Sequence, residues 1–313
     1  MLLPLDPASI ALLQGAAPDR LQWQMFDHCA AITRVYALFE KAVADLVEEY
    51  LLLLPKIQPT YSQLDSEVRV NYRVGVGAIL GKWKSDAASR YSHLAESAIA
   101  AGLTDGLRNQ PYSLLADAFL TDTDNYRADT LKKLFKRCGF DDAFASVAKN
   151  DEVQEFCRLN LGTETAESYL NEFVRTRNDA AHGSTTTTSS VKQICDYADF
   201  VILVVKVLAS VLRSRTIRDG VSTGHSLLVG KVIHRFSDNI VGIEAVSAGP
   251  IAAGDILFAG AKQIDPVTVL RLQIEETTHE VIALSPGLQF AVKLDKRIPE
   301  NSGLYRWEPN GAA

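Results

Sequence analysis

The chain has 313 residues, of which 47% are hydrophobic and 22% are charged, values that are ordinary for globular proteins with sizeable cores. This length is sufficient for two domains. The formal net charge of −6 argues against broad nonspecific binding to nucleic acids, which normally requires an excess of basic residues. An RNA ligand would therefore need a local basic surface.

The cysteines and histidines do not indicate a metal site or a disulfide framework. The four cysteines are far apart and include no Cys-x-x-Cys pair, and the six histidines include no His-x-x-x-His pair. We therefore predict no metal and no cofactor, and we expect the thiols to be reduced.

The usual signals for export or membrane insertion are also missing. Residues 1–7 contain no basic segment that leads into a continuous apolar core. The most apolar run, residues 200–208, is interrupted by a lysine and is shorter than the about 20 residues that a membrane span needs. We therefore expect a cytoplasmic protein without a membrane partner.

The first predicted helix spans residues 20–54. Its apolar residues recur at spacings of three and four, and Pro55 is expected to end it. Between residues 60 and 165 the pattern predicts shorter helices that are separated by polar turns. These helices are expected at residues 63–83, 84–101, 112–119, 128–138, 142–148 and 153–159.

The helix predicted at residues 128–138 carries the clearest basic cluster of this part of the chain. The cluster consists of Lys132, Lys133, Lys136 and Arg137. Their spacings place them largely on one helix face, where they could follow a phosphate backbone. The alternative, which the same pattern favours, is a solvated surface opposite the apolar residues of that helix.

The next predicted helix begins near Glu167 and ends in the segment Arg177-Asn178-Asp179-Ala180-Ala181-His182. Gly183 and a Ser/Thr tract follow, and both are helix-stop signals. A histidine exchanges protons near neutral pH, and an arginine presents a permanently charged planar fork that suits phosphate oxygens. The segment therefore places a group that can transfer protons, His182, and a group that can bind an anion, Arg177, at a helix end.

The spacing of Arg177 and His182 sets a condition on any site that uses both. Five positions on a regular helix correspond to roughly 500°, which places the two side chains about 140° apart. They share a face only if the helix breaks between them, or if two copies of the protein bring their motifs together. The simpler alternative is a surface arginine and a helix-capping histidine.

The chain changes character after the motif. A helix predicted at residues 191–215 has apolar residues on nearly all sides, which is typical of the central helix of a bundle. From residues 218–224 onward apolar and polar residues alternate, most clearly at residues 270–275 and 288–295. Turn signals recur at short intervals, so the pattern predicts many short strands and a small closed barrel.

The motif segment resembles the signature of the HEPN superfamily, in which an arginine, a polar residue, three further residues and a histidine end a helix. The match comprises Arg177, Asn178 and His182. The resemblance implies an all-α helical bundle at residues 1–217 that acts as a metal-independent endoribonuclease, with the motifs of a homodimer facing each other. Glu40 resembles an acidic residue near the active site of several HEPN families, although Ala44 replaces the lysine that often follows it.

The last part of the chain resembles domain II of translational GTPases and the small stand-alone relatives of that domain. The resemblance rests on the order of segments 229–236, 240–244, 251–260, 269–274 and 287–294, and on the turn Gly254-Asp255. It implies an all-β barrel at residues 225–308, a linker at residues 218–224 and a tail at residues 309–313. Such barrels contact ribosomal RNA or the acceptor end of tRNA, but this sequence contains no GTPase domain.

Together the two resemblances imply an endoribonuclease that cuts tRNA or ribosomal RNA and stops translation, as toxins and phage-defence or abortive-infection effectors do. Arg177 and His182 would be catalytic, while Asn178, Glu40 and the basic cluster would bind or orient the substrate. An antitoxin or activating partner is expected, since an active ribonuclease harms its host. Two alternatives stay open: a non-catalytic HEPN module that binds RNA, a nucleotide or a protein, and an adaptor that docks on the ribosome.

Overall fold

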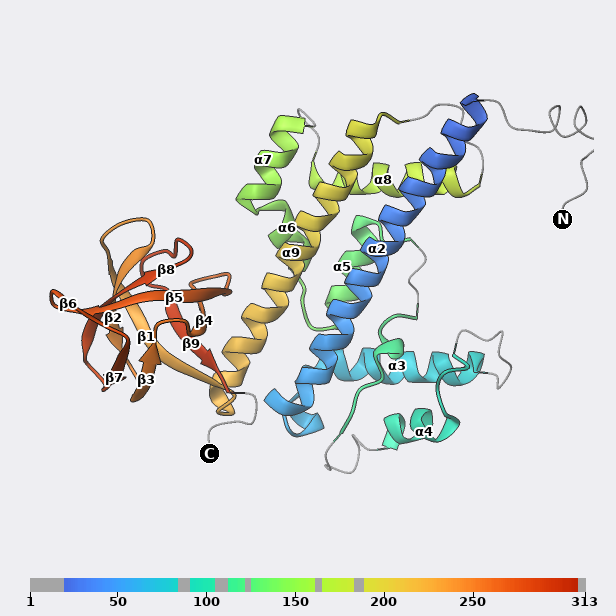
Figure 1. Ribbon diagram of the computed structural model, residues 1–313. Helices are drawn as coiled ribbons and strands as arrows, with labels where there is room; N and C mark the ends of the chain where they lie inside the picture. The colour runs from blue at the N-terminus through green and yellow to red at the C-terminus, as the bar shows by residue number, and fades with distance from the viewer. Residues whose placement is uncertain are drawn as a thin grey trace, which may run out of the picture. The chain divides into compact units, whose positions relative to one another are not determined.

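The structure, a computed structural model, describes residues 20–83, 91–104, 112–121, 125–160, 165–182 and 189–308. Helices form the chain as far as Ser222, and strands form it from Ser226 onward (Figure 1). The predicted order of an all-α part and an all-β barrel is therefore confirmed. No helix within these ranges is long and apolar enough to cross a membrane.

The chain folds into two compact units, each built from several separate segments. The first unit comprises Met1–Val43, Asn125–Asp129 and Ala148–Val205, and the second comprises Ala44–Asp124, Thr130–Val147 and Lys206–Ala313. Two long helices, α2 (Arg20–Ile57) and α9 (Val191–Ser222), contribute to both units. The motif segment belongs to the first unit and the barrel belongs to the second.

Helices α7 (Asp151–Asn160) and α8 (Ala166–Ala181) complete the first unit, together with the N-terminal parts of α2 and α9. The core of this unit is aromatic. The ring of Phe173 on α8 lies 6.0 Å from the ring of Tyr36 on α2 and 4.9 Å from the ring of Tyr197 on α9. All three rings are buried, so they fix α8 against both long helices.

The second unit contains further helices between the two long ones. These are η1 (Tyr61–Gln63), α3 (Ser66–Lys82), α4 (Glu96–Thr104), η3 (Ala116–Ala118), most of α5 (Ala128–Arg137) and α6 (Ala143–Ala148). Of the helix expected at residues 84–101, residues 84–90 lie outside the described ranges and α4 begins only at Glu96.

The helix expected at residues 112–119 is wrong, because this segment is irregular apart from the short η3. Its backbone packs directly against α3 at Gly75, where a Cβ would come within 1.8 Å of the Ala118 carbonyl oxygen. The hydroxyl of Tyr112 donates to the Gln58 carbonyl oxygen at 2.8 Å. Tertiary contacts therefore override the local apolar pattern here.

Both long helices end later than predicted. α2 continues through Pro55 to Ile57, where the buried Leu54 and Ile57 hold the last turn against the core. α9 continues to Ser222, so most of the predicted linker at residues 218–224 is helical. The end of α9 lies so close to the barrel that a Cβ at Gly220 would come within 3.2 Å of the Trp307 ring.

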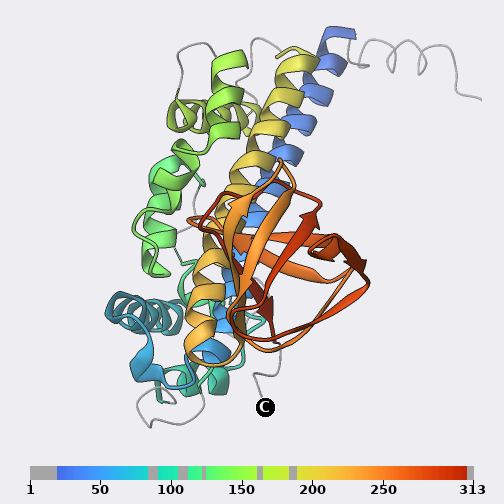
Figure 2. The same ribbon diagram turned by 90° about the vertical axis from the view of Figure 1, so that its left-hand side faces the viewer.

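In the described part of the chain nine strands follow α9. They are β1 (Ser226–Arg235), β2 (Ile240–Ala245), β3 (Gly249–Ala252), β4 (Ile256–Gly260), β5 (Asp265–Ile274), β6 (Thr277–His279), β7 (Val281–Leu284), β8 (Gln289–Leu294) and β9 (Gly303–Trp307). Neighbours in the order β4-β9-β1-β2-β8-β5 are antiparallel, and β4 also pairs with β5, so six strands close a barrel (Figure 2). Alternating residues such as Val241 and Ile243 of β2 fill its interior.

Polar contacts attach the end of α9 to the barrel. Arg213 pairs with Asp265 at 2.7 Å. The buried Oγ of Ser214 accepts a hydrogen bond from the backbone N–H of Ile264 at 2.7 Å and itself donates to the Ser210 carbonyl oxygen at 2.6 Å. The barrel is therefore joined to the helices through a hydrogen-bonded helix end.

Candidate active site at the end of α8

Helix α8 carries the motif segment in its last turns. Its N-terminus is closed by a capping box, in which Thr165 Oγ1 accepts from the Ser168 N–H at 3.2 Å and Ser168 Oγ accepts from the Thr165 N–H at 3.0 Å. The helix continues without a break through Ala181. His182 is the C-cap residue, and its N–H donates to the Asn178 carbonyl oxygen at 3.0 Å. The motif therefore stands at a helix end, as predicted.

The guanidinium of Arg177 rests on an aromatic ring of α2. Its central carbon lies 3.6 Å from the centre of the Tyr36 ring, which is a cation–π contact. Tyr36 is 2% exposed, and its hydroxyl oxygen accepts a hydrogen bond from the Tyr126 N–H at 2.8 Å. The Nε of Arg177 is buried and has no hydrogen-bond partner among the described residues. The Arg177 guanidinium is therefore held in place by the Tyr36 ring, while its Nε–H donates to no described residue.

Glu40 acts electrostatically on Tyr36, the residue that Arg177 contacts. Burial raises the pKa of the Tyr36 phenol, and the negative charge of Glu40 raises it further. The hydrogen bond from Tyr126 and the nearby charge of Arg177 act in the opposite direction without cancelling the rise. The phenol therefore stays neutral at physiological pH. Glu40 lies one turn after Tyr36 on α2, so the structure brings Tyr36, Arg177 and Glu40 together.

His182 and Asn178 are not part of this group. His182 is exposed at the end of α8, and Asn178 is partly exposed. Because the helix between Arg177 and His182 is unbroken, their side chains point in directions about 140° apart. The spacing allows the two side chains to share a face only through a helix break or through a second copy of the protein. The helix is not broken, so within one chain the two side chains do not share a face.

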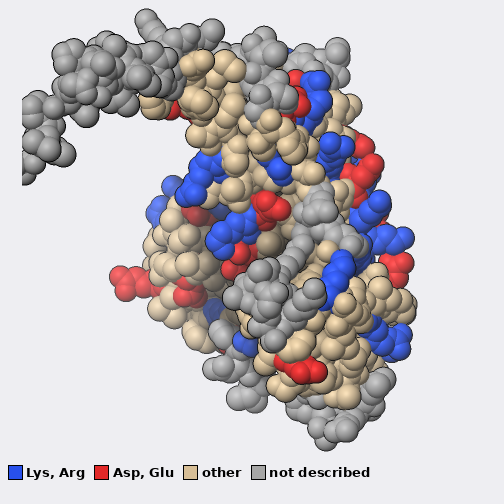
Figure 3. Space-filling view, turned by 90° about the vertical axis from the view of Figure 1, so that its right-hand side faces the viewer, with Lys and Arg blue, Asp and Glu red and all other residues tan. Residues whose placement is uncertain are grey.

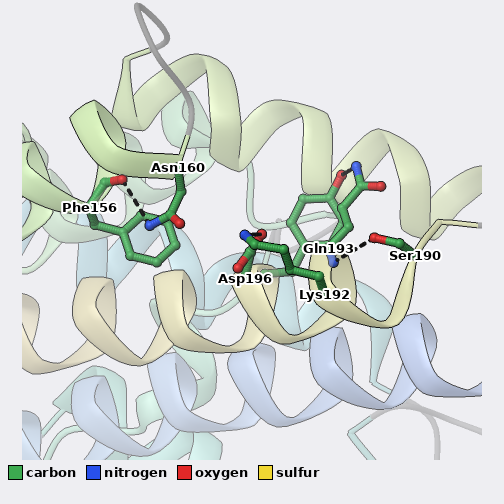
Figure 4. A network of polar contacts seen from close by, with 7 residues as sticks. Phe156, Asn160, Ser190, Lys192, Gln193 and Asp196 are labelled. Atoms are coloured by element: carbon green, nitrogen blue, oxygen red, sulfur yellow. Dashed lines mark hydrogen bonds and ion pairs between the residues drawn. The ribbon is translucent and has the colours of Figure 1, made fainter.

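A polar network at the start of α9 also supports the motif helix (Figure 4). Ser190 Oγ accepts from the Gln193 N–H at 3.1 Å, and the Gln193 side-chain amide contacts the Tyr197 hydroxyl at 3.2 Å. This hydroxyl contacts Thr176 of α8 at 3.4 Å. Since Thr176 directly precedes Arg177, α8 is held at the motif by α9 as well as by α2.

The predicted basic cluster lies on α5, in the second unit, and most of it is engaged in local contacts. Lys136 pairs with two carboxylates at 3.7 and 3.8 Å, and Arg137 donates to a backbone carbonyl oxygen at 3.5 Å. Lys132 lies 5.8 Å from the centre of the Phe144 ring. On the face shown in Figure 3, described basic and acidic side chains are interspersed. A role of Lys132, Lys133, Lys136 and Arg137 in substrate binding stays a prediction.

The described residues around Arg177 include no cluster of metal-ligating side chains. Across the described ranges no three His, Cys, Asp or Glu side chains are grouped so that they could hold a metal ion. Burial raises the pKa of the Cys138 thiol to about 12, which keeps this buried cysteine protonated and makes it a poor metal ligand.

Tyr36 is the site residue that sequence reasoning missed, because its helical spacing assigns it to the core. A usable signal was its spacing of four from Glu40, which places the two residues on one face of α2. The long-range contact with Arg177, 141 positions away in the sequence, could not be read from that pattern.

Comparison with known families identifies the helical part. The family described as RiboL-PSP-HEPN matches residues 9–214, and a HEPN domain indicates a ribonuclease or an RNA-binding protein. No curated protein matches the chain. One similar solved structure is flavohemoglobin from Malassezia yamatoensis with bound FAD and heme, at 12% identity and a TM-score of 0.13. That alignment covers 84% of this chain and 63% of the flavohemoglobin, and its low TM-score carries no argument about fold or function. Because the family match extends over residues 9–214 of 313, the chain belongs to the RiboL-PSP-HEPN family.

Proposed function

We propose that the protein is a metal-independent endoribonuclease that cuts RNA, with tRNA or ribosomal RNA as the substrate. Membership of a HEPN family supports the ribonuclease class. The observation that carries the proposal is that a ring-supported Arg177 and an exposed His182 both lie in the last turns of one unbroken helix. A cation and a proton-transfer group at a helix end are the components that phosphodiester cleavage without a metal requires.

The proposed reaction is a transesterification. The imidazole of His182 takes the proton of a ribose 2′-hydroxyl, whose oxygen attacks the adjacent phosphorus. The bond from phosphorus to the 5′-oxygen of the next nucleotide breaks, and His182 of the second protomer protonates that oxygen. The products are a 2′,3′-cyclic phosphate and a 5′-hydroxyl.

In this mechanism Arg177 stabilises the negative charge that develops on the phosphate oxygens in the transition state. Asn178 orients the phosphate or the end of α8 through its hydrogen bonds. Glu40 acts electrostatically on Tyr36, the residue that the guanidinium contacts, and in this proposal it helps to orient that pair.

The geometry of α8 supports a homodimer as part of this proposal. One chain presents Arg177 and His182 in different directions, so the two side chains converge only when a second copy supplies its own motif. The proposed active site is therefore shared between two protomers.

The barrel extends the proposal to the choice of target. Its resemblance to domain II of translational GTPases supports a module that brings the helical domain to translation machinery. A nuclease directed in this way would act as a toxin or a phage-defence effector in the cytoplasm, and an antitoxin or activating partner would restrain it.

The deciding experiment incubates the purified protein with total tRNA and ribosomes in excess EDTA and sequences the fragments. We expect discrete cuts that end in 2′,3′-cyclic phosphate and are absent with His182→Ala. A matched control is His93→Ala, because His93 lies in the second unit and, among the described residues, makes only an exposed hydrogen bond with Asp117 at 3.2 Å. Cutting that persists in His182→Ala would refute the catalytic assignment, whereas RNA binding without any cutting would favour the non-catalytic module.

A further inference from the structure

An exposed aromatic ring lies across the outer face of the barrel. Phe236 directly follows β1, and its side chain is 63% exposed. A Cβ at Gly242 of β2 would come within 3.2 Å of the Phe236 ring, so the missing side chain of this glycine makes room for the ring. The ring of His234 contacts Phe236 edge-on, with centroids 4.7 Å apart and an interplanar angle of 78°. Phe236 is therefore positioned by its neighbours although it is largely open to solvent.

The strands beside this ring carry small and then basic residues. Gly242 is paired with Ala291 of β8, whose short side chain leaves open space beside the Phe236 ring. On the same outer face, Lys293 of β8 stands directly opposite Arg271 of β5. Strands β2, β8 and β5 follow one another in the barrel. Gly242, which the ring approaches, pairs with Ala291, two residues from Lys293 on β8, so the ring and the two cations lie on the outer face of consecutive strands.

The placement of Lys293 opposite Arg271 is unfavourable without an anion. Like charges that face each other across two strands destabilise a sheet. In the described ranges neither side chain pairs with a carboxylate, and Arg271 donates only to the Thr278 hydroxyl at 3.2 Å. By contrast, Lys231 on β1 stands opposite a residue of the other charge, Glu244 of β2. The cation pair of Lys293 and Arg271 is therefore suited to bind a phosphate.

We propose that this surface, formed by Phe236, His234, Lys293 and Arg271 and called here the Phe236 face, binds single-stranded RNA. A base stacks on the Phe236 ring, and the adjoining phosphate binds between Lys293 and Arg271. The short side chain of Ala291, beside the ring, gives the nucleotide room to lie across the strands. The inference rests on the proposed function in that the ligand is RNA, and it assigns to the barrel a contact that is separate from the cleavage motif.

The stacking contact is tested with the full-length protein and a short fluorescent 2′-O-methyl oligoribonucleotide, which cannot be cut because its 2′-oxygen is blocked. Fluorescence anisotropy gives the Kd. We expect Phe236→Ala to raise the Kd about tenfold, while Phe236→Trp keeps the affinity because it keeps a stacking surface. Val281→Ala, which truncates another exposed apolar residue on β7, outside the six barrel strands, is the matched control and leaves the Kd unchanged. Equal affinities of Phe236→Ala and the wild type would overturn the proposal.

The phosphate contact is tested by the salt dependence of the same binding. Replacing both cations, in Arg271→Gln/Lys293→Gln, removes one or two phosphate contacts. The slope of log Kd against log salt concentration should then fall by about 0.7 to 1.4. Lys262→Gln, an exposed charge in the loop between β4 and β5, is the control and keeps the slope. An unchanged slope in the double variant, or equal affinity for a duplex of the same sequence, would contradict binding of a single strand at this face.

These results are independent of cleavage. Should the wild-type protein bind the blocked oligonucleotide through Phe236 yet cut no RNA, the nuclease proposal would fail and the Phe236 face would stand. Should the protein cut RNA while Phe236→Ala binds as tightly as the wild type, the Phe236 face would fail and the nuclease would stand.

Discussion

The contact of Arg177 with Tyr36 gives the motif arginine a defined position. A guanidinium on a long flexible side chain loses conformational freedom when it binds a phosphate, and this loss is smaller when the group is already held. The Tyr36 ring holds it at 3.6 Å, and the ring is itself fixed by burial and by the hydrogen bond from Tyr126. Tyr36 is therefore a positioning residue for the proposed reaction.

Tyr36→Leu should lower kcat/KM for RNA cleavage about tenfold, because an aliphatic side chain loses the cation–π attraction. Tyr36→Phe keeps the ring and should retain most of the activity. The measurement compares initial cleavage rates of both variants, with circular dichroism to verify that the helices remain folded. Equal losses in the two variants would assign the effect to the Tyr36 hydroxyl and its bond to Tyr126 instead of the ring.

His28 on α2 is a second residue whose burial has a measurable consequence. Its side chain is 5% exposed, and neither ring nitrogen has a hydrogen-bond partner among the described residues. Burial lowers the pKa of this imidazole from its ordinary value of 6.5, because the charged form is poorly solvated. The folded protein therefore takes up this proton at lower pH than the unfolded chain does.

The sign of the pH effect follows from proton linkage. Well above pH 6.5 His28 is neutral in both states and does not affect the free energy of unfolding. Below that pH the unfolded chain binds a proton first, so acid destabilises the folded protein until the folded-state pKa is passed. His28→Leu should remove this contribution, which urea unfolding of variant and wild type at pH values on either side of 6.5 would detect. A stability difference that is the same at both pH values would contradict the prediction.

At the scale of the elements, α9 links the aromatic core of the first unit to the barrel of the second. Its N-terminal half supplies Tyr197 and Phe200 to the first core, and its C-terminal half bonds to β5 and to the loop before it. The buried Oγ of Ser214 is central to this attachment, because it is the acceptor for the Ile264 N–H.

Ser214→Ala should destabilise the second unit by about 1 to 3 kcal/mol, because the Ile264 N–H stays buried without an acceptor. The free energy of unfolding in urea provides the measurement, and faster hydrogen exchange of the Ile264 amide locates the effect. Ser222→Ala is the matched control, since Ser222 lies at the exposed end of the same helix and donates only to the Asp219 carbonyl oxygen. A change of similar size in both variants would argue against a specific role of Ser214.

At the scale of the whole molecule, the proposed site is complete only in a dimer. In the proposed mechanism each cleavage uses the two His182 imidazoles, one as the base and one as the acid. A protomer that carries His182→Ala should therefore inactivate a wild-type partner.

Co-refolding equal amounts of wild type and His182→Ala should leave about one quarter of the wild-type activity per dimer, since only wild-type pairs are active under random pairing. Lys262→Gln, which alters an exposed charge of the second unit, serves as the control and should preserve activity in the same mixture. Retention of one half of the activity would show that each protomer acts alone and would contradict the shared site.

Much of the fold could be predicted from the sequence, because it depends on local periodicity. The 3.6-residue pattern of α2, α8 and α9 and the alternation in β5 and β8 are set by which residues each element buries. The stop signals after His182 likewise placed the motif at a helix end. Sequence patterns do not predict the structure where it depends on contacts with a segment that is far away in the chain. β9 was not recognised as a separate strand, and yet it pairs with both β1 and β4 to close the barrel.

The sequence by itself determined the all-α and all-β parts, the motif of Arg177 and His182, and its position at the end of a helix. Only the tertiary structure decided that α2 passes Pro55, that α9 reaches Ser222, and that Tyr36 supports Arg177. The physical reason is the range of the interactions. Helix and strand periodicities reflect neighbours within a few residues, whereas these outcomes depend on burial and contacts between segments that are far apart in the chain.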